Sequence, residues 1–150
     1  MIEIVERIEV PASPEAVWVV LADPYAVVEC IPGAELTGEA DDGSFEGKLG
    51  VKFGPTRIGF RGRVRVELDE ANRRGTVSGR GKDSVGGTRV EAKARFSVVP
   101  DGAGSVIDMT STVDVTGRLA TFIEGGARLV AKQLSAEFAQ RLARRVAPAT

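Results

Sequence analysis

The fold is decided by residues 107–142, which have the sequence IDMTSTVDVTGRLATFIEGGARLVAKQLSAEFAQRL. Up to Gly117, apolar and polar residues alternate, which predicts a strand with one buried face. After Gly117, apolar residues recur every three or four positions, which predicts an amphipathic helix. This helix is expected to cover about 28 residues, roughly 42 Å of length. Its apolar stripe consists of Leu119, Phe122, Ile123, Gly126, Ala127, Val130, Leu134, Phe138 and Leu142.

The alternating pattern extends upstream of this helix over most of the chain. Between Glu35 and Thr116, runs of period two are separated by turn-forming pairs such as Gly54-Pro55 and Gly86-Gly87. Runs of this kind predict half-buried antiparallel strands joined in a meander. About six strands are expected in this part of the chain. The clearest of them cover residues 45–53, 58–68, 76–82, 90–98 and 107–115.

The start of the chain predicts one strand and two short helices. Residues 13–15, Ser-Pro-Glu, are typical of a helix N-terminus, because the hydroxyl caps the helix, the proline fits its first turn and the acid suits its dipole. Residues 23–24, Asp-Pro, repeat this signal and predict a second short helix that ends near Cys30. The preceding strand ends at Pro11, and its apolar residues of one parity are Ile2, Ile4, Ile8 and Val10.

A sheet with one apolar face and a helix with one apolar stripe can bury both by packing against each other. We therefore expect an α+β fold, in which a curved antiparallel sheet of about seven strands wraps around the long C-terminal helix. Two short helices follow the first strand in this arrangement. The whole chain, residues 1–150, is expected to form a single domain.

Composition excludes several classes of function. The chain has 20 Lys and Arg residues against 21 Asp and Glu, and a net charge of −1, so its total charge does not favour nucleic acid. It has no histidine, which removes histidine-based triads and nearly all zinc chemistry. A single cysteine cannot form an internal disulfide and favours a reducing compartment. The longest apolar run, residues 16–22, is too short to cross a bilayer, so we expect a soluble intracellular protein.

Short motifs connect this order of elements to a known superfamily. Residues 16–24, which contain Ala-Val-Trp and Asp-Pro, resemble the opening helices of the START-like (SRPBCC) helix-grip superfamily. Residues 30–34, Cys-Ile-Pro-Gly-Ala, resemble the signature of one branch, the CoxG family of carbon monoxide dehydrogenase subunits. Residues 117–122 are similar to the start of the last helix in that family. The resemblance covers about residues 2–146.

This resemblance implies a helix-grip fold with an apolar cavity between sheet and helix. It also implies that the partner is an aerobic, molybdenum-containing carbon monoxide dehydrogenase or a related oxidoreductase. On this basis we expect a cytoplasmic protein that associates peripherally with the inner face of the cytoplasmic membrane. The expected ligand is menaquinone or another isoprenoid quinone, with no covalent cofactor and no metal. Members of the family often continue past the domain into a linker and a further segment, whereas this chain stops at Thr150.

Small residues on the inner face of the predicted sheet indicate space for a ligand. An ordinary core fills such positions at close to crystal density, so small residues opposite a long helix predict a cavity. The alternative is that the glycines mark bulges and bends of a strongly curved sheet. The small residues of inward parity are Gly47, Gly62, Gly79, Gly81, Ala92, Ala94 and Ser111.

The residues expected to line this cavity are nearly all apolar, although each of them could equally be ordinary core. Burial of about 400 Å² of ligand surface would supply on the order of 10 kcal/mol before the costs of association, which suits a lipid-like ligand. The hydroxyl of Tyr25 is expected at the cavity mouth, either bonded to a ligand carbonyl or simply at the surface. The predicted ligand-binding residues are Tyr25, Val28, Ile31, Leu36, Leu49, Phe60, Val64, Phe96, Met109, Ser111, Val113, Phe122, Ile123, Val130 and Leu134.

Two further side chains are candidates for reactive groups. Glu6 shares the parity of Ile4 and Ile8, and a buried, unpaired acid would be a candidate site. We expect it instead near the exposed end of its strand. Cys30 would need an activating partner to act as a nucleophile, and the chain has no histidine, so a small buried hydrophobic residue is the better interpretation.

One face of the predicted sheet is locally basic. The cations on it could dock an acidic protein or anionic lipid headgroups. The alternative is a solvated face balanced by Glu46, Glu67, Glu91, Asp108 and Asp114. Nucleic acid is not expected, because the face has no aromatic residues for base stacking. The basic residues are Arg57, Arg61, Arg63, Arg65, Lys48, Lys52, Arg80, Lys93 and Arg95.

Taken together, these features favour a non-enzymatic carrier of an apolar small molecule, with no catalytic residues. A first alternative is an enzyme, since START-like relatives include cyclases and aromatases. Such an enzyme needs converging acid-base groups, and here Tyr25, Glu6 and Ser111 are the candidates. A second alternative is a docking or assembly factor that binds no ligand.

Overall fold

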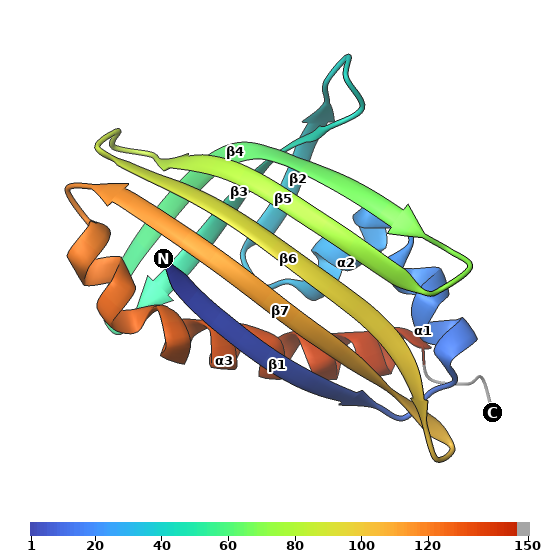
Figure 1. Ribbon diagram of the computed structural model, residues 1–150. Coiled ribbons are helices and arrows are strands. Elements are labelled where there is room, and N and C mark those ends of the chain that lie inside the picture. The colour runs from blue at the N-terminus through green and yellow to red at the C-terminus, as the bar shows by residue number, and fades with distance from the viewer. Residues whose placement is uncertain (147–150) are drawn as a thin grey trace.

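The computed structural model describes residues 1–146, and it confirms the predicted α+β helix-grip architecture. Seven strands form one antiparallel sheet that curves around the long C-terminal helix, and two short helices follow the first strand (Figure 1). The elements are β1 (Ile2–Val10), α1 (Pro14–Leu21), α2 (Pro24–Cys30), β2 (Ala34–Glu39), β3 (Phe45–Phe53), β4 (Thr56–Asp69), β5 (Arg74–Asp83), β6 (Thr88–Asp101), β7 (Gly104–Gly117) and α3 (Ala120–Val146).

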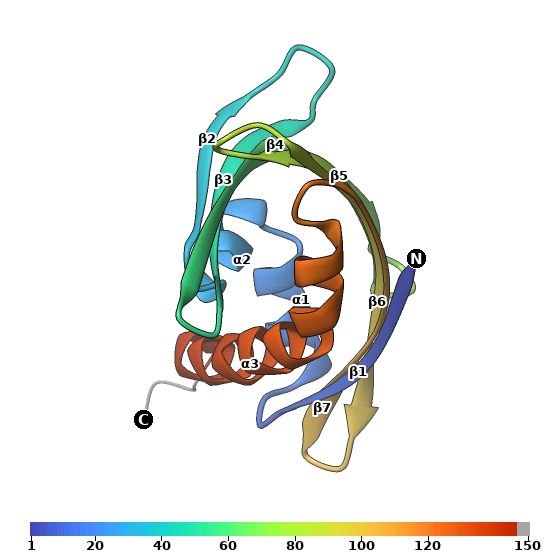
Figure 2. The ribbon, with the colours of Figure 1, turned by 90° about the vertical axis from the view of Figure 1, so that its left-hand side faces the viewer.

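The strands lie in the order β1-β7-β6-β5-β4-β3-β2, so each pairs with its neighbour in the chain except that β1 pairs with β7. The α1–α2 segment therefore carries the chain from one edge of the sheet to the other. Figure 2 shows the sheet bending around α3, with α1 and α2 at one end of the enclosed space. Strands β4, β6 and β7 are longer than the alternation predicts, because their ladders continue through polar residues to the turns.

Both short helices begin as the sequence predicts. The hydroxyl of Ser13 accepts a hydrogen bond from the backbone N–H of Ala16 at 3.2 Å, and Pro14 occupies the first turn of α1. The carboxylate of Asp23 accepts from the N–H of Tyr25 at 3.1 Å at the start of α2. These caps satisfy backbone donors that have no partner within the helix. The long helix covers 27 residues, close to its expected length.

The main cluster of buried apolar residues lies at one end of the molecule, where α1, α2 and the last turns of α3 meet the ends of β1, β6 and β7. Ile2, Val51, Ile58 and Ile123 are buried outside this cluster. Val17 on α1 and Leu142 on α3 are 0% exposed, and Ile107 on β7 is 1% exposed. The hydroxyl of Ser105 donates to the carbonyl oxygen of Ala12 at 2.6 Å and fastens the β1–α1 connection to β7. We call this region the packed end, and its core residues are Ile8, Val10, Ala12, Val17, Trp18, Val20, Leu21, Ala26, Cys30, Val98, Ile107, Phe138 and Leu142.

Two glycines show how the curvature of the sheet is built. A Cβ at Gly62, which faces Gly81 across the β4–β5 ladder, would collide with the backbone of Arg80. Glycine is therefore needed at Gly62 for close strand approach, which at this position supports the interpretation of sheet bending. At Gly75, the ring of Phe96 on the neighbouring strand occupies the space that a side chain would take. An aromatic residue thus shields a glycine that has no side chain to pack.

Candidate ligand-binding site

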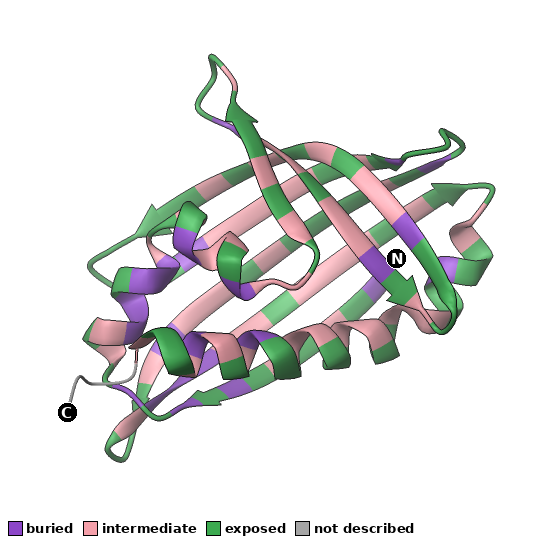
Figure 3. Ribbon diagram, turned by 180° about the vertical axis from the view of Figure 1, so that it is seen from behind, coloured by how far each residue is buried: buried purple, intermediate pink, exposed green. Residues whose placement is uncertain are grey.

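The concave face of the sheet is incompletely covered at its centre. Ala92 shares the inward face of β6 with Val98, which is buried in the packed end, yet Ala92 itself is exposed. Its neighbours on the same face, Ala94, Ser111 and Val113, are only half-buried. Figure 3 shows mainly intermediate and exposed residues along the middle of the strands, with buried residues toward both ends of the molecule. Solvent therefore reaches the inner face of the sheet, as a ligand-binding hollow requires.

The path of α3 explains this exposure. The helix packs against β1, β3 and β7, and against α1 and α2 at the packed end. Within residues 1–146, the central strands β4, β5 and β6 contact α3 at most marginally. The helix therefore leaves the small side chains of these strands partly uncovered. No helix in the same range is long and apolar enough to cross a membrane.

A pocket of about 580 Å³ lies between the β3–β4 hairpin and the first half of α3. The rings of Phe53 and Phe122 stand 5.8 Å apart at this pocket, and a Cβ at Gly126 would come within 3.0 Å of Phe53. Glycine in α3 therefore lets the hairpin approach the helix closely. The side chains of Phe122 and Leu129 are 46% and 63% exposed. The lining residues are Lys52, Phe53, Gly54, Thr121, Phe122, Gly125, Gly126, Leu129, Val130 and Gln133.

The predicted lining residues fall into several environments. Phe122 and Val130 line the pocket at the first half of α3, and Ile123 is buried. A second group is partly buried and packs against the core of the packed end: Ile31, Phe96 and Met109. The others, on the concave face or on elements beside it, are half-buried: Val28, Leu36, Leu49, Phe60, Val64, Ser111, Val113 and Leu134.

Tyr25 is engaged with the protein itself. Its hydroxyl donates a hydrogen bond to the carboxylate of Glu39 at the end of β2, and its ring meets that of Phe45 edge-on at 5.8 Å. The hydrogen bond to Glu39 raises the pKa of Tyr25, with smaller contributions from burial and from the charges of Glu39 and Asp23. Tyr25 is 51% exposed and ties α2 to the β2–β3 hairpin. Its hydroxyl is therefore already used in this structure.

The three candidate acid-base groups do not converge. Glu6 lies at the centre of β1, half-buried and opposite Met109, so the expectation that it sits near the strand end is wrong. The reason is that the pairing of β1 with β7 continues to Val10. Ser111 pairs with Ile4 and is thus a diagonal neighbour of Glu6, whereas Tyr25 is bonded to β2 at the opposite edge of the sheet.

Two side chains of the packed end bear on reactivity. Cys30 is buried, and burial raises the pKa of its thiol, which outweighs the opposing charges of Arg145 and Arg141. A protonated, buried thiol is unreactive, in agreement with its interpretation as a small hydrophobic residue. The sequence did not point to Trp18, whose Nε1 is buried without a hydrogen-bond partner and whose ring lies 6.2 Å from that of Phe96. An unpaired buried donor calls for an explanation.

A family model described as the CoxG subunit of carbon monoxide dehydrogenase matches residues 7–147 of the chain. No curated protein sequence matches it significantly.

Several solved structures are similar to this fold. A conserved protein from Geobacillus kaustophilus is 20% identical with a TM-score of 0.83, and the match covers 97% of this chain and 95% of that one. A START superfamily protein from Mycobacterium smegmatis is 20% identical with a TM-score of 0.58, over 96% of each chain. The ZhuI aromatase/cyclase from Streptomyces sp. R1128 is 18% identical with a TM-score of 0.60, over 97% and 93%.

Proposed function

Since this chain belongs to the CoxG family of carbon monoxide dehydrogenase subunits, we propose that it binds and carries an apolar, lipid-like ligand without changing it chemically. The ligand we propose is an isoprenoid quinone such as menaquinone. The observation that carries the proposal is the exposed Ala92 on a face whose neighbours are small or apolar. A folded domain would otherwise fill such a face with its own side chains.

The chemistry of the hollow suits this class of ligand. Pockets for such molecules are mainly apolar, with a few polar groups that fix orientation. Contact with about 400 Å² of ligand would supply on the order of 10 kcal/mol before association costs. The unpaired Nε1–H of Trp18 is a donor that a quinone carbonyl could accept from, provided the ligand reaches the packed end. The hydroxyl of Tyr25 is a weaker candidate, because Glu39 already accepts its hydrogen bond.

The family name supplies the partner in this proposal. A dehydrogenase that releases electrons needs an acceptor, and a quinone takes two electrons and two protons to become the quinol. Quinones reside in the membrane, so a carrier that extracts one there can bring it to a molybdenum-containing carbon monoxide dehydrogenase or a related oxidoreductase. The proposed site of action is therefore the cytoplasm, at the inner face of the cytoplasmic membrane. Recruitment of the enzyme to that membrane surface would also bring the enzyme and the quinone together.

The central test of this proposal uses the intrinsic tryptophan fluorescence of the protein. Trp18 is its only tryptophan, so quenching of the intrinsic fluorescence by added menaquinone reports binding directly. We expect saturable quenching in the wild type, and a quinone mass in organic extracts of the purified protein. Ser111→Phe, on the concave face of β7, should weaken the quenching. Thr110→Phe, on the opposite face of the same strand, is the matched control and should not.

Absence of saturable quenching together with a ligand-free extract would remove the carrier proposal and favour a docking factor. The enzyme alternative has the ZhuI aromatase/cyclase as its structural precedent, at 18% identity. It predicts a covalent change in a bound ligand that Glu6→Gln abolishes without loss of binding. Glu6 lies on β1 at one edge of the sheet, and Tyr25 is bonded to β2 at the other edge. This arrangement supports the carrier proposal over the enzyme alternative.

A further inference from the structure

The outward side chains of β3, β4, β5 and β6, which we call the convex face, carry most of the positive charge of the protein. Twelve of its 20 Lys and Arg residues lie there, and all twelve are exposed. They are Lys48, Lys52, Arg57, Arg61, Arg63, Arg65, Arg74, Arg80, Lys82, Arg89, Lys93 and Arg95. The acids of the same strands and parity are five: Glu46, Glu67, Asp69, Glu91 and Asp101. The remainder of the chain is therefore strongly acidic, since the total charge is −1.

Strand register places four of these cations in one line across the sheet, which we call the basic row. Lys48 faces Arg61 across the β3–β4 ladder, Arg61 faces Lys82 across β4–β5, and Lys82 faces Arg89 across β5–β6. Neighbouring strands are about 4.8 Å apart, so each cation has a like charge directly beside it. Within residues 1–146, none of the four forms an ion pair.

The adjacent row on the same four strands is built differently, and we call it the paired row. In register it consists of Glu46, Arg63, Arg80 and Glu91. Arg63 lies 3.3 Å from the carboxylate of Glu46, and Arg80 lies 3.2 Å from that of Glu91. The paired row is thus neutral. In the basic row beside it, Glu35 of β2 faces Lys48, while Arg61, Lys82 and Arg89 have only cations opposite them on β3–β6.

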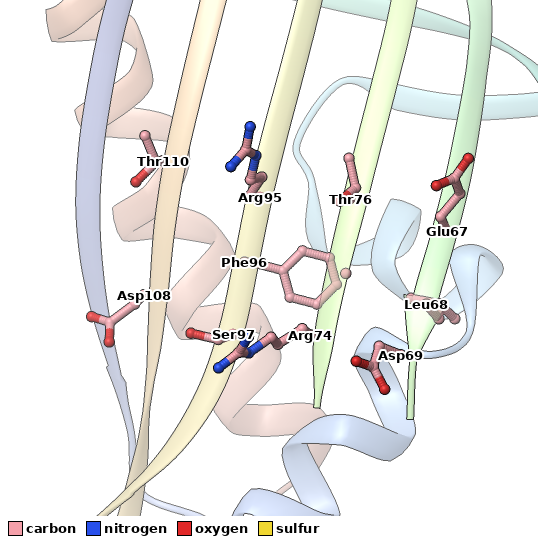
Figure 4. Close-up of a pocket in the computed structure, with 11 residues that line it drawn as sticks. Glu67, Leu68, Asp69, Arg74, Thr76, Arg95, Phe96, Ser97, Asp108 and Thr110 are labelled. Carbon is pink, nitrogen blue, oxygen red and sulfur yellow. The ribbon is translucent and has the colours of Figure 1, made fainter. Parts of the chain in front are cut away.

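The rest of the convex face is also closer to balance. Toward the far ends of these strands, a pocket of about 560 Å³ is lined by Arg74 and Arg95 together with Glu67, Asp69 and Asp108 (Figure 4). Most of the excess charge therefore lies in the basic row. A smaller part lies elsewhere on the convex face, where Lys52 faces Arg57. Like charges directly opposite each other in a sheet destabilise the fold, so the Arg61–Lys82 and Lys82–Arg89 neighbours oppose folding. Glu35 of β2 faces Lys48 and offsets the charge at that end of the row.

We propose that the basic row is a docking site for a row of carboxylates on a partner protein. A rigid sheet holds the four cations at fixed spacing, and guanidinium groups match carboxylates in bidentate geometry. Most exposed large hydrophobic side chains lie elsewhere, at positions such as Val5, Val19, Phe122 and Leu129. Near the row there is one, Val85 in the β5–β6 turn. A bilayer surface would be engaged by cations and apolar anchors together, and single-stranded nucleic acid by cations and aromatic residues. The convex face offers mainly charge.

This inference rests on the proposed function for the identity of the partner, the oxidoreductase that receives the ligand. An interface of charges without an apolar anchor forms quickly, depends on salt and dissociates readily, as repeated delivery requires. The uneven distribution of charge over the protein also orients it during approach. The concave side stays free for the ligand, because the basic row lies on the other face of the sheet.

The test compares the two rows by removing two charges from each. The first variant combines Arg61→Gln with Lys82→Gln in the basic row, and the control combines Arg63→Gln with Arg80→Gln in the paired row. The probes are a poly-glutamate peptide and the purified holoenzyme of the molybdenum-containing carbon monoxide dehydrogenase. At low ionic strength, the basic-row variant should bind each probe at least about tenfold more weakly than the wild type. The control loses the same net charge, so it should also bind more weakly, but by less than the basic-row variant, because Arg63 and Arg80 already bind Glu46 and Glu91.

Equal losses in the two variants would overturn the proposal, since they would indicate diffuse attraction. It would also be overturned if the wild type bound neither probe. Two further results would overturn it in favour of another partner. The first is that the row binds phosphatidylglycerol vesicles but not the peptide. The second is that the wild type forms a salt-sensitive dimer, which the charge substitutions in the basic row dissociate. Row-dependent binding of the peptide without binding of the dehydrogenase would support the docking row and count against the proposed function. Menaquinone quenching, measured separately, tests the carrier role alone.

Discussion

The two halves of α3 have the same secondary structure but opposite environments. Toward its C-terminus, Phe138 and Leu142 are buried against α1, α2 and the sheet. Toward its N-terminus, Ile123 is buried, but Phe122 and Leu129 are largely exposed beside an open pocket. The difference therefore arises from what packs on the helix. It divides the domain into a packed end that provides stability and an open end that gives a ligand access.

Local stability should follow the same division. Regions with few buried apolar contacts open at low free energy, whereas the core opens only with the whole domain. The first half of α3 also contains Gly125 and Gly126, and each glycine costs a helix interior about 1 kcal/mol relative to alanine. A ligand that enters between this half and the β3–β4 hairpin therefore meets the least stable part of the helix.

The largest expected effect is on thiol reactivity. Cys30 is the only cysteine and is buried at the packed end, so its labelling should require near-global opening. A thiol introduced by Ala92→Cys, in a Cys30→Ala background, lies on the open face and should react directly. A stability of several kcal/mol then separates the two labelling rates by a factor on the order of 10³ or more.

Labelling of unfolded protein in urea provides the control, because both thiols should then react at similar rates. Menaquinone should slow the labelling of the thiol introduced by Ala92→Cys and leave that of Cys30 nearly unchanged. Rapid labelling of Cys30 in the native protein would contradict the assignment of a rigid packed end.

Two leucines of α3 give the next largest contrast. Leu142→Ala should lower the free energy of unfolding by about 2–5 kcal/mol, since Leu142 is fully buried and its loss leaves a cavity. Leu129→Ala should change it by less than about 0.5 kcal/mol, because Leu129 is 63% exposed. Urea unfolding followed by circular dichroism measures both. Similar losses in the two variants would mean that the halves of α3 are equally packed.

Enlarging an alanine in each region should separate stability from ligand binding. Ala26→Leu inserts bulk into the packed end and should cost about 1–3 kcal/mol of stability. Ala92→Leu adds bulk to the open face and should leave stability nearly unchanged while it weakens menaquinone quenching. The comparison is made between folded proteins at the same temperature. Loss of quenching in Ala26→Leu alone would place the ligand at the packed end.

Much of the fold could be predicted from the sequence because its signals are local. The change of period at Gly117 predicts the sheet and the long helix, and Ser13 and Asp23 predict the two short helices through their caps. Parity also assigns Ala92 to the inner face. It cannot tell which strands the helix leaves uncovered, since that depends on the path of α3 across a curved sheet.

Other features depend on contacts between distant elements. Gly62 has the parity of a cavity residue, but the backbone of Arg80 on the next strand decides its role. The basic row needs four strands in register, which is fixed by the lengths of three hairpins and cannot be read from any one strand. The pairing of Tyr25 with Glu39 likewise joins a helix to a strand whose sequence signals are independent.

The smallest expected effect concerns this contact, which links the packed end to the edge of the open side. The hydrogen bond to the Glu39 carboxylate raises the pKa of Tyr25, and burial and nearby negative charges add to it. Because the folded-state pKa is the higher one, the contact stabilises the fold fully below the ordinary pKa of tyrosine, and this contribution is lost as the pH rises through the raised value.

Tyr25 is the only tyrosine, so an ultraviolet titration reports it alone. We expect a midpoint above that of free tyrosine, lowered by Glu39→Gln and unchanged by Glu35→Gln on the same strand. Equal midpoints in the wild type and Glu39→Gln would mean that α2 is not held to the β2–β3 hairpin in solution.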